Sequence, residues 1–197
     1  MDRIRSLAVA GPAAAAALAC WAATASAIEK PFQFGFGGGA TVPVGDAGDA
    51  LKSGWHGTAI FRFNLPGSPI DIRGLASYRH FNLDPGTAGS DGSSKILSGL
   101  GNIAYKIPFA GPVKPYITAG IGAFNVKTSY DAAGVPDPAS TTEFGIDVGA
   151  GVEFGLMGLS GFVEAKFENV YTNEGFNPAV TQDIDTQMIP VTFGVFF

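Results

Sequence analysis

The chain closes on a stretch that decides its fold, Ile189-Pro190-Val191-Thr192-Phe193-Gly194-Val195-Phe196-Phe197. One parity of this stretch carries only large apolar side chains: Ile189, Val191, Phe193, Val195 and Phe197. The other parity carries side chains that are small or of mixed character. Successive side chains of a β-strand point to opposite faces, so this alternation predicts a strand with one continuous apolar face.

The same alternation recurs seven times earlier in the chain. In the clearest segment, Phe144, Ile146 and Val148 face one way, while Gly145 and Asp147 face the other. Each segment has roughly the ten residues that a tilted strand needs to cross a bilayer. The pattern predicts eight strands, at 32–42, 55–65, 70–81, 96–107, 113–126, 143–155, 161–171 and 189–197.

The connections between these segments alternate between long and short. Long polar stretches lie at 44–54, 82–95, 127–142 and 172–187, and short turns at 66–69, 108–112 and 156–160. Outer-membrane barrels have short periplasmic turns, long extracellular loops and an even strand number. A soluble β-sandwich has no reason to keep this alternation. We therefore predict an all-β fold, an eight-stranded antiparallel up-and-down transmembrane β-barrel.

The first 27 residues have the features of a targeting segment. Arg3 and Arg5 precede an uncharged, alanine-rich stretch that ends in a small-residue A-x-A motif at Ala27. This pattern predicts a secretory signal peptide at 1–27, followed by one barrel domain at 28–197. An uncleaved membrane helix is the alternative that the length permits, and the A-x-A ending favours cleavage.

Four motifs occur in order along the chain: Val42-Pro43-Val44-Gly45-Asp46, Lys114-Pro115-Tyr116-Ile117-Thr118-Ala119-Gly120-Ile121-Gly122, Val148-Gly149-Ala150-Gly151-Val152-Glu153-Phe154 and Phe162-Val163-Glu164-Ala165. In this order they resemble the strands of the OmpA/OmpX-like outer-membrane β-barrel domain family. The resemblance implies a place in the bacterial outer membrane, with membrane lipids, the barrel assembly machinery and periplasmic chaperones as partners. It also implies that the closing stripe is the assembly signal, carried by Ile189, Val191, Phe193, Val195 and Phe197.

If the apolar faces meet lipid, the opposite faces carry twelve charges into the interior. The cations are Arg62, Arg73, Arg79, Lys106, Lys114 and Lys166, and the anions are Asp71, Glu143, Asp147, Glu153, Glu164 and Glu168. Side chains fill an eight-stranded barrel, and an unpaired buried charge is costly. We expect a packed network of ion pairs, with space left by Gly120, Gly122, Gly145, Gly149 and Gly151. The alternative is a narrow gated channel that uses the same pairs.

The outer ends of the predicted strands carry aromatic residues on the apolar faces. Near the long loops we expect an aromatic girdle made of Trp55, Tyr78, Phe144 and Tyr171. Two function classes then remain open. One is a structural barrel whose long loops meet an extracellular ligand, and the other is a small transport barrel. The charged interior argues against transport of apolar solutes.

No catalytic, cofactor-binding or metal-binding signature is found. Ser77 and His80 lie an odd number of residues apart, so they face opposite sides of a strand. His56 and Thr58 share a face, but such a pair is more often structural, so a lipid-modifying enzyme is the least favoured interpretation. The loop acids Asp84, Asp91, Asp183 and Asp185 lack the spacing of a calcium loop.

The charge and cysteine content exclude further classes. The chain has a formal net charge of −5 and no basic run, which disfavours nucleic-acid binding. Its one cysteine, Cys20, lies in the predicted signal peptide. The predicted domain therefore has no thiol for a disulfide or for thiol catalysis.

We predict cleavage between Ala27 and Ile28, because Ala25 and Ala27 are the small residues that signal peptidase accepts. N-terminal sequencing of the protein extracted from membranes checks this. A start at Cys20 carrying lipid would identify a lipoprotein instead.

Overall fold

The structure is a computed structural model that describes residues 30–45, 48, 51–83, 92–130, 140–156, 158–171 and 186–197. This part of the chain contains eight strands, as the sequence pattern predicts. They are β1 (Phe32–Val44), β2 (Gly54–Asn64), β3 (Ile70–Asn82), β4 (Gly92–Lys106), β5 (Val113–Tyr130), β6 (Thr141–Leu156), β7 (Leu159–Tyr171) and β8 (Thr186–Phe196). The predicted signal peptide lies outside the described residues. No helix in the described ranges is long and apolar enough to cross a membrane.

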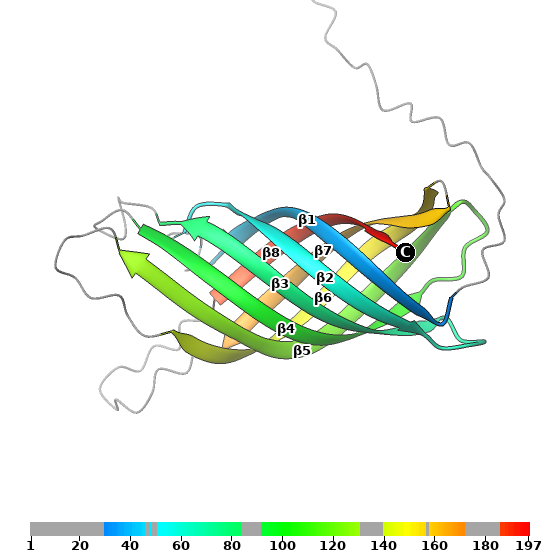
Figure 1. The fold of residues 1–197 in the computed structure, drawn as a ribbon, viewed down its shortest axis with the longest axis horizontal. Helices are drawn as coiled ribbons and strands as arrows, with labels where there is room; N and C mark the ends of the chain where they lie inside the picture. The colour runs from blue at the N-terminus through cyan, green and yellow to red at the C-terminus, as the bar shows by residue number, and fades with distance from the viewer. Residues whose placement is uncertain are drawn as a thin grey trace, which may run out of the picture.

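The strands form one closed antiparallel barrel in chain order, with β8 paired to β1 (Figure 1). A line of paired residues that starts at Phe34 on β1 and crosses every strand returns to β1 at Val44, ten residues further on. This stagger is what tilts the strands against the barrel axis. The predicted eight-stranded up-and-down barrel is confirmed.

The two ends of the barrel differ. The turns β2–β3, β4–β5 and β6–β7 lie at one end, together with the start of β1 and the end of β8 (Figure 1). We call this the turn end, and its tight connections use Gly67 (φ 73°) and Gly158 (φ 89°). The four longer connections join strands at the opposite end, the loop end. Most of their residues, including Asp84, Asp91, Asp183 and Asp185, lie outside the described part.

β4 and β5 extend furthest into the predicted loops, by four residues each. β4 begins at Gly92 rather than residue 96, and β5 runs to Tyr130 rather than residue 126. In the added part, Ser93 pairs with Ser129 and Ser94 with Thr128. Backbone pairing needs no apolar side chain, so the alternation marks the apolar band and not the whole length of the ladder.

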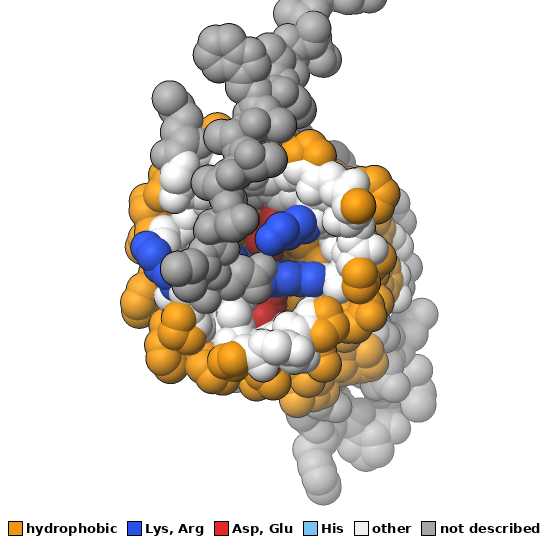
Figure 2. All heavy atoms as spheres, turned by 90° about the vertical axis from the view of Figure 1, so that its right-hand side faces the viewer, with side chains coloured by type: hydrophobic (Ala, Val, Ile, Leu, Met, Phe, Trp, Pro, Cys, Tyr) orange, Lys and Arg blue, Asp and Glu red, His pale blue; other side chains and the backbone are white. Residues whose placement is uncertain are grey.

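The apolar parity faces outward, as predicted. On β8, Ile189 and Phe193 are exposed, as is Phe197 directly after it, whereas Met188 and Phe196 are buried inside. Figure 2, which views the turn end, shows hydrophobic side chains as an outer ring around a charged centre. An exposed apolar surface of this extent fits a hydrocarbon surrounding and not water.

The closing seam between β1 and β8 is tight at Gly39. A Cβ atom built there would collide with the backbone carbonyl of Val191 on β8 and would lie 3.3 Å from Cε1 of His56. A Cβ atom at Gly57, on the outer face of β2, would meet nothing within 4 Å. The seam therefore depends on the missing side chain of Gly39.

We expect Gly39→Val to lower the free energy of unfolding by about 1–3 kcal/mol, because the strands must move apart to admit the side chain. Samples are heated to a series of temperatures before detergent gel electrophoresis. The measurement is the temperature at which the band of the folded species disappears. Gly57→Val is the matched control and should leave this temperature unchanged. Equal effects of the two changes would show that close approach at the seam does not limit stability.

Candidate functional site in the barrel interior

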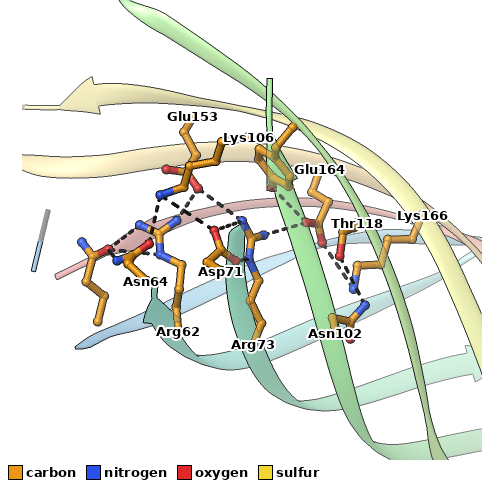
Figure 3. Close-up of polar contacts among 12 residues, drawn as sticks. Arg62, Asn64, Asp71, Arg73, Asn102, Lys106, Thr118, Glu153, Glu164 and Lys166 are labelled. Carbon is orange, nitrogen blue, oxygen red and sulfur yellow. Dashed lines mark hydrogen bonds and ion pairs between the residues drawn. The ribbon is translucent and has the colours of Figure 1, made fainter. Parts of the chain in front are cut away.

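Arg73 is the centre of an ion-pair network at the turn end. Its Nε and Nη2 atoms donate to the two carboxylate oxygens of Asp71 at 2.6 and 3.2 Å. Nη1 lies 3.1 Å from Oε2 of Glu164, and Nη2 lies 3.4 Å from Oε1 of Glu153. These side chains come from β3, β6 and β7 and converge on one buried guanidinium (Figure 3). We call Arg62, Asp71, Arg73, Glu153 and Glu164 the ionic cluster.

Arg62 joins the ionic cluster from β2. Its Nη1 atom pairs with Oε1 of Glu153, and Nε and Nη2 donate to Oε1 of Gln33 at 3.1 and 2.5 Å. The guanidinium carbon lies 3.8 Å from the centre of the Phe196 ring, a cation–π distance. Phe196, the inward-facing last residue of β8, therefore supports the network.

A second branch leads from the ionic cluster toward the middle of the barrel. Lys166 Nζ lies 3.6 Å from Oε1 of Glu164 and 3.3 Å from Oδ1 of Asp147. Asn102 donates to the same Asp147 oxygen at 2.5 Å, and the Tyr116 hydroxyl donates to Glu164 at 2.9 Å. Lys166 thus joins the carboxylate of Asp147 to that of Glu164, which belongs to the ionic cluster.

Closer to the loop end, Arg79 forms a separate pair. Its Nη2 atom lies 2.8 Å from Oε1 of Glu168, and Nη1 donates to the Ser98 hydroxyl at 2.9 Å. Within the described part of the chain, Glu168 is the single carboxylate that pairs with Arg79. This arrangement differs from that of Arg73, which is shared by three carboxylates.

The interior near the loop end contains a layer of apolar side chains, which the sequence analysis missed. Five side chains that are almost fully buried form a layer there: Phe81, Ile96, Phe124, Val170 and Met188. Leu51 and Val126 pack against the layer. The predicted residue Glu143 is also buried at this end, where it is paired with Phe124, so the apolar layer is an addition to the expected charged groups. The sequence did contain a signal for this layer. Its apolar residues lie on the inward parity in the parts of the strands next to the long loops.

The predicted interior residues are not all brought together. The structure buries Arg62, Asp71, Arg73, Asp147, Glu153, Glu164, Lys166 and Glu168, together with Arg79 and Glu143. Lys106 is partly buried near Asp71, with 3.9 Å between its Nζ and Oδ2 of Asp71. Lys114 is exposed. It is the second residue of β5, at the rim of the turn end, so its long side chain reaches water there.

The inward-facing glycines provide space, although not only for charged groups. Cβ atoms at Gly120, Gly149 and Gly151 would collide with the side chains of Asn102, Lys166 and Tyr116, respectively. Those at Gly122 and Gly145 would instead collide with Leu100 and Phe124. Small residues on the inner face therefore admit both the ionic and the apolar side chains.

His56 forms a hydrogen-bonded bridge across the closing seam. Its Nδ1 and Nε2 atoms each lie 2.9 Å from a threonine hydroxyl, of Thr41 on β1 and Thr192 on β8. Ser77 is buried inside, whereas His80 lies on the outer parity, so the two face opposite sides as predicted. Among the described residues, no group of three or more His, Cys, Asp or Glu side chains could hold a metal ion.

Comparisons with known proteins agree with this geometry. A model of the outer membrane protein beta-barrel domain matches residues 13–197. The chain belongs to this family. It is similar to the crystal structure of Neisserial surface protein A (NspA), with a TM-score of 0.61 and 15% identity over 85% of this chain and 96% of that one.

A second similar structure is a major outer membrane protein from Thermus thermophilus. The TM-score is 0.51 and the identity 16%, over 85% of this chain and 99% of that one. At such identities the likeness shows the fold alone. No curated protein matches the chain significantly.

The four predicted girdle residues lie on the outside near the loop end. The ring centres of Trp55 and Tyr78 are 5.7 Å apart, and those of Phe144 and Tyr171 are 6.4 Å apart. Both pairs are exposed on neighbouring strands. Aromatic residues at this height are typical of the interface between lipid tails and headgroups.

We expect Glu168→Gln to lower the free energy of unfolding by about 3–5 kcal/mol, since it leaves Arg79 buried without its carboxylate. Glu164→Gln should cost less, because Arg73 keeps Asp71 and Glu153. Thermal unfolding in detergent compares the two variants.

The double change Arg79→Met with Glu168→Met is the control, since it removes both charges and keeps similar volume. It should recover most of the stability. If Glu168→Gln is as stable as the wild type, the Arg79–Glu168 pair does not hold a buried charge in place.

Proposed function

We propose that this protein is a non-conducting barrel of the bacterial outer membrane with a structural or surface-interaction role. The observation that supports this most directly is the filled interior. The ionic cluster occupies the turn end, and the apolar layer occupies the loop end. Buried side chains at both ends leave the loops and the outer wall as the functional surfaces.

The orientation follows from the connections. In outer-membrane barrels the short turns and both chain ends face the periplasm. With the turn end on that side, the four longer connections at 45–53, 83–91, 131–140 and 172–185 face the outside of the cell. They would supply the surface that meets an extracellular ligand.

Assembly is proposed to use the closing strand. Ile189 and Phe193 on β8, with Phe197 directly after it, form an outward apolar stripe, and β8 must pair with β1 to close the barrel. Periplasmic chaperones would hold the exposed apolar faces before insertion, and the barrel assembly machinery would read the stripe. The chain needs such partners because its outer surface is apolar around the whole barrel.

A catalytic role is not part of the proposal. His56 is 4% exposed, and both of its ring nitrogens are hydrogen-bonded to threonine hydroxyls inside the barrel. His80 lies on the outer parity, opposite Ser77. The threonine hydroxyls beside His56 are buried with it inside the barrel, so we interpret these hydrogen bonds as structural.

We expect no steady ion current through the refolded protein in a planar bilayer, because two unlike layers block the interior. Glu164→Gln and Asp147→Asn should reduce thermal stability and leave the bilayer silent. A steady current in the wild type, with ion selectivity altered by these two changes at unchanged stability, would identify a channel instead.

A further inference from the structure

The outer wall carries a row of basic residues near the loop end. His80 on β3 is paired directly with Lys95 on β4, and Lys95 is paired directly with Lys127 on β5. Both lysines are exposed on the outward parity. We call these three side chains the basic row.

Two lysines directly opposite each other on neighbouring strands repel. Among the described residues, no acidic side chain forms an ion pair with Lys95 or Lys127. An anion from outside the chain would relieve this repulsion. The basic row therefore has the chemistry of an anion site on the wall of the barrel.

The height of the basic row indicates where that anion comes from. Lys95 stands two residues from Leu97 on the outer face of β4, and His80 stands two residues from Tyr78 on β3. Trp55 is paired directly with His80. The row thus lies just beyond the aromatic residues that mark the edge of the apolar band, at the level of lipid headgroups.

An apolar groove lies directly beside the basic row on the same outer wall. It has a volume of about 440 Å³ and crosses β1 to β4. Phe36, Trp55, Tyr78 and Leu97 line its sides, and Gly57, Ala59 and Ala76 are among its small lining residues. Tyr78 and Leu97 are also the neighbours of His80 and Lys95, so the groove is continuous with the row.

We propose that the basic row and the groove form one binding site for a phosphate-bearing lipid of the leaflet at the loop end. The phosphate lies between Lys95 and Lys127, and an acyl chain lies in the groove against Trp55. A soluble anion would use the lysines alone and would leave the groove without a role. The lipid is therefore the occupant that accounts for both features.

The test uses quenching of Trp55 fluorescence by brominated acyl chains. In the protein that begins at Ile28, the predicted mature start, Trp55 is the single tryptophan. The refolded protein is placed in phosphatidylcholine vesicles that contain a minor amount of brominated phosphatidic acid or, separately, brominated phosphatidylcholine. We expect stronger quenching by the brominated phosphatidic acid, with a preference of roughly five-fold for each lysine at low salt.

Two pairs of matched variants locate the site. Lys95→Gln with Lys127→Gln should abolish the headgroup preference. Lys30→Gln with Lys52→Gln, which removes two exposed lysines outside the strands, should keep it. Gly57→Leu should weaken quenching by filling the groove, whereas Gly101→Leu, at another outward position with open space, should not.

Equal quenching by the two headgroups in the wild type would overturn the proposal, as would a preference that survives the loss of both lysines. Inorganic phosphate at constant ionic strength distinguishes a soluble ligand. If it removes the preference, the basic row binds free phosphate and not a lipid. A detergent gel shift confirms that each variant is folded, and the headgroup comparison in the wild type is decisive by itself.

Discussion

The pairing of β8 with β1 is the constraint on which the rest of the structure depends. A strand edge left open in lipid would expose unpaired backbone groups that no water can satisfy, so the barrel must close. Closure after eight strands, with a ten-residue stagger, fixes a narrow interior. The inner faces of all strands then meet one another. Every inward side chain must find its partner in that space.

This crowding explains why β1 contributes small residues to the inner face. Gly35 and Gly37 admit the side chains of Phe196 and Thr192, and Gly39 admits the backbone carbonyl of Val191. Phe196 is thereby free to lie against Arg62. The inward glycines of β1 and the aromatic ring of Phe196 at the end of β8 therefore depend on each other for packing. Neither is explained by its own strand alone.

The sequence predicted the strand number, the order and the two faces because each depends on a period of two within one segment. It did not predict the partners, because Arg62 and Glu153 are distant in the chain and meet only through the register of all eight strands. Lys114 was expected inside because parity gives the face and not the height. The same limit hid the apolar layer, since Phe81 and Met188 share the parity of the charged residues. The height of a residue along the barrel axis depends on the stagger between strands. The pattern within one segment gives no information about that stagger.

In the proposed non-conducting barrel, the two interior layers would exclude different solutes. Beyond the ionic cluster an ion would meet the apolar layer of Phe81, Ile96 and Met188, whose side chains cannot replace its hydration shell. An apolar solute that passed that layer would meet Arg73 and its carboxylates, and it would separate charges that are costly to leave unpaired. Charge balance alone would not exclude both classes, because a neutral polar interior still conducts water. Two unlike layers in series along the axis would exclude both classes, which is the physical basis for proposing that the interior is a structural core and that exchange with the surroundings takes place at the loops and at the lipid-facing wall.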